Sequence, residues 1–151
     1  MEDRLTIKQR VLDACFEQQK KVMQNLKVVM EEVADSAEEY GLPKDLYDSY
    51  RNQMMSKRDM FAQQLQKIQE QVDILRRVDM TRTYNSARFG AIVVTETQRI
   101  FIAAGLGKVN ADGVEYFVIS ALVPFYGAID GKKAGDTFDF RGKKEKIVEV
   151  F

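Results

Sequence analysis

The stretch EEVADSAEEYGLPKDLYD, residues 31–48, decides the fold because it places a turn between two long helical patterns. Gly41 is typical of the end of a helix, and Pro43 is typical of the first turn of the next one. The flanking segments are rich in Gln, Glu, Lys and Met, and neither contains Pro or Gly in its interior. Since the connection is short, an antiparallel helical hairpin is predicted. Each arm of about 30 residues would be roughly 45 Å long at 1.5 Å per residue.

Apolar positions spaced alternately by four and three residues predict that the two arms pack as a coiled coil. The first stripe is Ile7, Val11, Ala14, Gln18, Val22, Leu26, Val29, Val33 and Tyr40. The second is Met54, Arg58, Phe61, Leu65, Ile68, Val72 and Leu75. Cys15 is expected to pack as a small apolar residue in the seam between the arms.

After Asp79 the period changes to that of short strands bounded by turn residues. The predicted strands are residues 89–95, 99–103, 114–119, 137–140 and 146–151, and residues 110–113, Asn-Ala-Asp-Gly, predict a hairpin turn. A short helix is predicted at 124–130, followed by a loop at 131–136. The sequence therefore predicts an α+β chain, with a hairpin over residues 1–79 and a small, mostly antiparallel β domain over residues 80–151.

The charge of the chain is polarised although its formal net value is zero. No basic residue lies between Lys27 and Lys44, whereas this interval contains five acidic residues: Glu31, Glu32, Asp35, Glu38 and Glu39. Basic residues gather instead at 132–133 and 143–146. The balanced total argues against a general nucleic-acid binder, which would normally be basic. The acidic turn predicts a partner that carries positive charge or a metal ion.

Composition excludes several kinds of catalytic site. Cys15 is the single cysteine and the chain has no histidine, which rules out an internal disulfide, a thiolate cluster, histidine-ligated zinc and Ser-His or Cys-His catalysis. No apolar run approaches the roughly 20 residues that span a bilayer. The first residues lack the pattern of a secretory signal. A cytoplasmic protein without a membrane partner is expected.

Residues 124–136, PFYGAIDGKKAGD, follow the hairpin and β pattern in a way that resembles the bacterial Gre-type transcription elongation factors. That family carries a pattern close to S-P-x-x-x-A-L-x-G-K-x-x-G-D before its last strand. The matching residues here are Pro124, Ala128, Gly131, Lys132, Gly135 and Asp136, while Val123 replaces the serine. The family's tip motif, D-L-S-E-N, corresponds to residues 45–49, Asp-Leu-Tyr-Asp-Ser. The chain most resembles the shorter, divergent Gre-like proteins.

The resemblance implies an accessory factor without an active site of its own. Gre factors bind RNA polymerase and insert the hairpin into its secondary channel, where the tip acids help to hold a second catalytic Mg²⁺ and the polymerase cleaves its backtracked transcript. The corresponding acids here are Asp45 and Asp48. Contact with nucleic acid would occur only within the elongation complex, and a monomer is expected. The predicted contacts with the polymerase are Pro124, Phe125, Tyr126, Ile129 and Lys132.

Several alternatives remain open from the sequence. Asp45 and Asp48 can simply stabilise the start of a helix, and the acids of the first arm can form a solvated face that shapes the local field. The chain can be a modulator or inhibitor of the same channel that does not stimulate cleavage. Because Gre C-terminal domains resemble the FKBP fold, a prolyl isomerase or chaperone is a further alternative. The last is an adaptor that dimerises through the hairpin.

Overall fold

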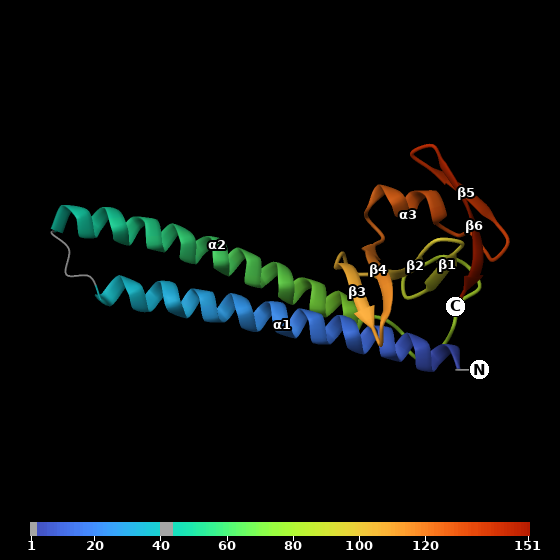
Figure 1. The fold of residues 1–151 in the computed structure, drawn as a ribbon, viewed down its shortest axis with the longest axis horizontal. Coiled ribbons are helices and arrows are strands. Elements are labelled where there is room, and N and C mark those ends of the chain that lie inside the picture. Colours follow the sequence, from blue (N-terminus) through green and yellow to red (C-terminus); the bar gives the residue numbers. More distant parts are fainter. Residues whose placement is uncertain (1–2, 40–43) are drawn as a thin grey trace. The chain divides into compact units, whose positions relative to one another are not determined.

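The computed structural model describes residues 3–39 and 44–151, without the side chains of residues 33–39, 44–47 and 50. Two long helices come first, followed by six strands and one short helix (Figure 1). The elements are α1 (Arg4–Glu39), α2 (Lys44–Arg76), β1 (Ile92–Thr95), β2 (Arg99–Ala103), β3 (Gly107–Ala111), β4 (Val114–Ser120), α3 (Pro124–Ile129), β5 (Thr137–Phe140) and β6 (Lys143–Val150). This order confirms the predicted α+β class, with a helical pair before a small β domain.

The chain groups into two compact units. One contains Met1–Gln18 together with Gln71–Phe151, and the other contains Gln19–Glu70. The first unit thus holds the sheet and the helical ends next to it, and the second holds the remainder of α1 and α2. The predicted division into modules 1–79 and 80–151 stays a prediction.

The unit formed by Gln19–Glu70 contains antiparallel stretches of α1 and α2 (Figure 1). On α2, the predicted stripe is largely confirmed, since Met54, Phe61 and Leu65 are half-buried and Ile68 is buried. Arg58 is the exception because its side chain is exposed. The coiled-coil packing of the two helices stays a prediction.

On α1, the predicted stripe holds at Leu26, which is half-buried, but is wrong at two other positions of this unit. Val22 and Val29 are 43% and 41% exposed, so they do not lie on the buried face. The buried or half-buried residues that repeat along α1 are Lys8, Leu12, Cys15, Gln19, Met23, Leu26 and Met30. These positions recur every 11 residues, at about 3.67 residues per turn, which is closer to the period of a straight helix than a heptad is. The heptad assumed from the sequence therefore drifts off the true face.

The sheet has the strand order β3-β4-β2-β1-β6-β5. Four of its neighbouring pairs are antiparallel, and β2 and β4 run parallel, with Ile100 opposite Phe117 and Ala103 opposite Ser120. The predicted, mostly antiparallel sheet is therefore confirmed, and one parallel pair makes it a mixed sheet. Its parallel pair arises because the β3–β4 hairpin places β4 beside β2, and this depends on tertiary pairing that no local pattern encodes.

Both faces of the sheet are buried in the unit that contains it. Successive residues of β2 alternate between the two faces: Phe101 belongs to a cluster with Val11, Leu75 and Tyr116, and Ile100 to a cluster with Ile129. The near-continuous apolar run of β2 is typical of a strand covered on both sides. The first cluster joins the start of α1 and the end of α2 to the sheet, and the second joins α3 to its other face.

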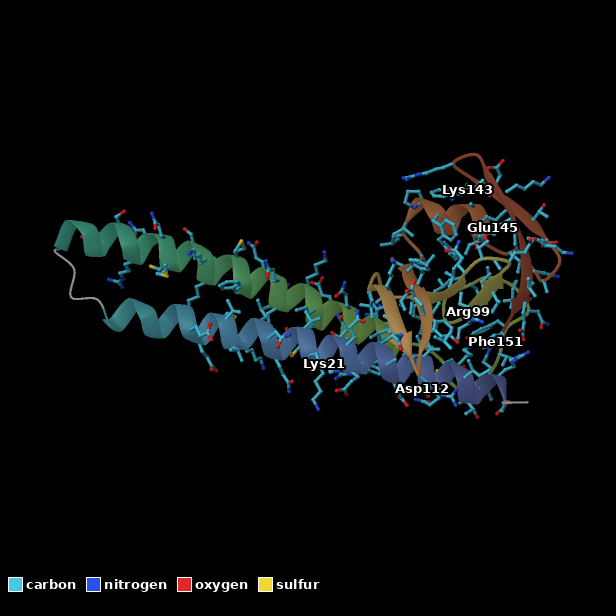
Figure 2. All side chains as sticks on the ribbon, viewed as in Figure 1. Lys21, Arg99, Asp112, Lys143, Glu145 and Phe151 are labelled. Atoms are coloured by element: carbon cyan, nitrogen blue, oxygen red, sulfur yellow. The ribbon has the colours of Figure 1, made fainter. Side chains whose placement is uncertain are left out.

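Polar contacts add to this packing of α1 on the sheet. Arg10 Nε lies 2.9 Å from Asp112 Oδ2 at the β3–β4 turn, and Arg4 forms an ion pair with Glu149 (Figure 2 labels Asp112). The turn itself is the predicted one, because Asp112 and Gly113 have φ of 50° and 83°, and Gly113 N donates to Asn110 Oδ1 at 2.9 Å. None of the helices in the described ranges is long and apolar enough to span a membrane.

Candidate functional site

The two predicted tip acids lie one turn apart at the start of α2, which begins at Lys44. Asp48 has an exposed side chain, and the side chain of Asp45 lies outside the described residues. Positions three apart in a helix share one face. Asp48 therefore offers a solvent-facing carboxylate where the helix dipole already favours negative charge.

The acids of the first arm are described in part. Glu31 and Glu32 have exposed side chains, whereas the side chains of Asp35, Glu38 and Glu39 lie outside the described residues, as do the turn residues 40–43. For the side chains that the structure does describe, no cluster of three or more Cys, Asp or Glu could hold a metal ion. That search does not reach the Asp45 side chain, so the predicted magnesium-binding role of Asp45 and Asp48 stays a prediction. Carboxylate oxygens are nevertheless the ligands that Mg²⁺ prefers.

The predicted partner-binding residues fall on α3 and the loop that follows it. Pro124 is exposed at the first turn of α3, where its missing N–H leaves no intrahelical hydrogen bond unmade. Phe125 is half-buried, and its ring meets Phe138 and Phe140 edge to face, with centroids 5.8 and 5.1 Å apart. These contacts hold α3 against β5 and leave only part of the Phe125 ring at the surface.

Ile129 is fully buried, in the cluster that includes Ile100, Ile102 and Ile147. The expectation that it is exposed enough to meet a partner was wrong. The physical reason is that α3 is short and amphipathic, and it needs one large apolar side chain to anchor it to the sheet. Ile129 serves as this anchor.

Tyr126 is half-buried and points its hydroxyl group along α3. Its Oη donates a hydrogen bond to Asp130 Oδ1 at 2.9 Å. Burial raises the pKa of the Tyr126 hydroxyl, and the hydrogen bond to the Asp130 carboxylate raises that pKa further. Tyr126 therefore stays a neutral donor tied to the end of α3.

The loop 131–136 is built by the residues that match the family pattern. Gly131 and Gly135 have φ of 71° and 92°, a region that favours glycine. Asp136 Oδ2 accepts a hydrogen bond from Lys133 N at 2.8 Å, and Lys132 is half-buried. Three of the matching residues, Gly131, Gly135 and Asp136, thus shape the loop itself, and Lys132 adds a partly exposed positive charge.

Leu122 is a candidate contact residue that the sequence did not predict. It lies between β4 and α3, is 93% exposed, and its backbone N donates to Ser120 Oγ at 3.1 Å. A single exposed apolar side chain is normal on a protein surface, so Leu122 indicates a binding surface only together with its neighbours around α3. The signal was its position just before Pro124, because a helix that starts at Pro124 leaves the preceding residues in a surface loop.

Neither a protein-family model nor a curated protein matches this chain. Among solved structures, the chain is similar to the crystal structure of GreA factor homolog 1 (Gfh1) protein of Thermus thermophilus, with 16% sequence identity and a TM-score of 0.33 over 93% of this chain and 92% of that chain. It is also similar to the structure of the transcription factor Gfh1, with 15% identity and a TM-score of 0.34 over 92% of this chain and 90% of that chain. The likeness to Gre-factor homologues is distant.

Proposed function

We propose that this chain is a Gre-like accessory factor, which binds RNA polymerase through its β domain and presents Asp45 and Asp48 to the polymerase active centre. The exposed carboxylate of Asp48 at the start of α2, within the tip segment that resembles the Gre motif, carries the proposal. Helices α1 and α2 contain 36 and 33 residues. At 1.5 Å per residue each is roughly 50 Å long, enough to reach into a deep channel.

At the polymerase, Asp45 and Asp48 would supply carboxylate oxygens to a magnesium ion whose other ligands come from the enzyme. The ion, when bound, would stabilise the charge that develops in phosphodiester cleavage. This chain's contribution is to hold the two acids one helical turn apart. The exposed Glu31 and Glu32 add negative charge on the first arm, which favours the approach of cations.

The surface around α3 would supply the contact with the polymerase. Leu122 and Pro124 are exposed neighbours, and Lys132 adds a positive charge in the following loop. Protein-binding surfaces combine apolar side chains with a polar rim, and the proposed contact has both. Leu122 therefore replaces the buried Ile129 among the proposed contacts.

A non-cleaving modulator of the same channel is the second candidate. Asp48 stands where the family pattern has glutamate, and its side chain is shorter by one methylene. A shorter reach affects the metal-assisting step without affecting entry into the channel. The two candidates therefore share the binding surface and differ only at the tip.

The first test is co-purification of the full chain with bacterial core RNA polymerase. Leu122→Asp should weaken binding by at least about tenfold, because it places a charge in the centre of the contact. Val148→Asp is the matched control, since Val148 is 56% exposed on β6. Absence of any binding by the wild type would reject the proposal.

The second test is transcript cleavage by a backtracked elongation complex. Asp45→Asn with Asp48→Asn should abolish stimulation and retain polymerase binding, and Glu96→Gln with Glu115→Gln is the matched control, because it removes the same charge at exposed positions of the β domain. If the wild type binds but slows cleavage, and the tip variant does not relieve this effect, the chain acts as a channel-blocking modulator.

A further inference from the structure

Three cationic side chains surround the ring of Tyr84. The distances from the ring centroid are 4.7 Å to Lys8 Nζ, 5.0 Å to Arg82 Cζ and 4.6 Å to Arg88 Cζ. Lys8 comes from α1, and the other two flank Tyr84 in the segment between α2 and β1. All belong to the same compact unit.

The cluster has a buried side and an exposed side. Lys8 is fully buried and donates a hydrogen bond to the carbonyl oxygen of Arg82 at 3.2 Å. Arg82 and Arg88 are exposed, while Tyr84 is half-buried next to Gly90. The ring is thus fixed from beneath, and two guanidinium groups remain at the surface around it.

No carboxylate in the described part of the chain forms an ion pair with Lys8, Arg82 or Arg88. Asp79 attracts both Lys8 and Arg82, but its carboxylate already accepts hydrogen bonds from the backbone N and the hydroxyl group of Thr81. Among the described residues, the positive charge of the cluster is offset by the Tyr84 ring and by the attraction of Asp79 to Lys8 and Arg82.

The positive charges of Lys8, Arg82 and Arg88 repel one another. All three cations lie within about 5 Å of one point, so each is within a Debye length, ~10 Å, of the others and their repulsion is only partly screened. A single ring has two faces, and a cation–π contact contributes only about 0.5–2 kcal/mol. Burial, together with Arg82, lowers the pKa of Lys8 to about 8. An anion bound to these guanidinium groups beside the Tyr84 ring would relieve the repulsion.

We propose that Arg82 and Arg88 bind a phosphate group beside Tyr84, with Lys8 supplying positive charge from beneath the ring. Guanidinium groups suit this ligand because their N–H donors match phosphate oxygens in bidentate geometry. The phosphate can come from a free pyrophosphate-containing molecule or from a nucleic-acid backbone. The site uses none of the residues assigned to polymerase binding or to the hairpin tip, so it stands independently of the proposed function.

Isothermal titration of the full chain at low ionic strength tests the site, with inorganic pyrophosphate and a 12-nucleotide single-stranded RNA as separate probes. Arg82→Gln with Arg88→Gln should weaken binding by at least about tenfold, as expected for loss of one charge-assisted hydrogen bond. The matched control is Arg99→Gln with Lys143→Gln, which removes the same charge at exposed positions of β2 and β6 (labelled in Figure 2).

A loss confined to the Arg82/Arg88 variant supports the site, and the probe that shows the loss identifies the source of the phosphate. Equal losses in both variants, or no binding of either probe by the wild type, would overturn the proposal. A second readout is the pKa of Lys8 itself, measured by NMR of its side-chain nitrogen. Saturating probe should raise that pKa, because an anion beside Tyr84 favours the charged ammonium group. An unchanged Lys8 pKa would contradict the predicted position of the anion.

Discussion

The ammonium group of Lys8 lies 4.7 Å from the centroid of the Tyr84 ring, in a fully buried position. Burial, with a smaller contribution from Arg82, lowers the pKa of Lys8 from 10.5 to about 8, and attraction to Asp79 opposes this lowering. Between these two pKa values the unfolded chain retains a proton that the native state has lost. The free energy of unfolding should therefore rise as the pH increases from 8 toward 10.5, by on the order of 1–2 kcal/mol.

Urea unfolding of wild type and Lys8→Met at pH 7.5, 9 and 10 checks this prediction. The variant should lack the rise because its side chain does not titrate. Lys143→Met is the control for general effects of lost positive charge, since Lys143 is exposed on β6. If the free energies of unfolding of the wild type and of Lys8→Met change with pH in the same way, the assigned pKa is contradicted.

Gly90 and Gly113 both have positive φ, 88° and 83°, but only Gly90 has close neighbours. A Cβ at Gly90 would lie 3.4 Å from Tyr84 Cε2 and 3.7 Å from Val78 Cγ1, whereas a Cβ at Gly113 meets nothing within 4 Å. Replacement by alanine should cost about 1 kcal/mol at either site, from backbone strain. Replacement by leucine should cost roughly 1–3 kcal/mol more at Gly90 than at Gly113, because a longer side chain overpacks against Tyr84. Thermal unfolding of the four variants measures this difference, and equal losses for the two leucine variants would show that the space around Gly90 is not restrictive.

Glu145, which is labelled in Figure 2, connects β6 to the β1–β2 turn. Its carboxylate accepts hydrogen bonds from Thr95 Oγ1 at 2.9 Å, from Gln98 Nε2 at 3.2 Å and from the Thr97 hydroxyl. Partial burial raises the pKa of Glu145, but these hydrogen bonds outweigh it and leave the pKa below the ordinary value. The stabilisation is therefore present above the ordinary glutamate pKa of about 4.3 and is lost as the pH falls through the lower folded value.

Glu145→Gln should accordingly lower the free energy of unfolding by about 1 kcal/mol at pH 7 and by much less at pH 3. Denaturant unfolding at both values gives the comparison. Glu115→Gln, at an exposed position of β4, serves as control and should change little at either pH. If Glu145→Gln lowers the free energy of unfolding equally at both pH values, the shape of the Glu145 side chain, and not its charge, accounts for its contribution to stability.

The sequence predicted the regular elements well where the local pattern was strong. Strands β2 and β5 begin and end at the predicted residues, 99–103 and 137–140, because β-branched and aromatic runs bounded by turn residues leave little ambiguity. Strand β3, Gly107–Ala111, was not among the predicted strands. It is an edge strand of Gly, Lys, Val, Asn and Ala, and only Val109 and Ala111 are buried, so its local pattern is weak.

The candidate surfaces were predicted less well because they depend on contacts between distant segments. Lys8 and Arg82 are 74 positions apart in the sequence, and nothing local marks them as neighbours of Tyr84. Ile129, predicted as a contact, is buried, and Leu122, not predicted, is exposed, for a similar reason. Which apolar residue near α3 is buried depends on how α3 meets β5 and the sheet, and sequence spacing alone does not determine this.

Cys15 reports on how tightly the start of α1 is held in its cluster. It is fully buried with Val11 and Leu75, and burial raises the pKa of its thiol to about 12. The reactive thiolate should therefore be accessible only after local or global unfolding.

At pH 8, a disulfide reagent should label the Cys15 thiol of the native chain more slowly than that of the urea-unfolded chain, by a factor on the order of 10³ or more. Leu75→Ala, which opens a cavity beside Cys15 and costs about 2–5 kcal/mol, should accelerate native labelling by at least ~30-fold, whereas Leu122→Ala, at an exposed position, should not. Rapid labelling of a wild-type chain with intact circular dichroism would show that α1 separates from the sheet without unfolding of the domain.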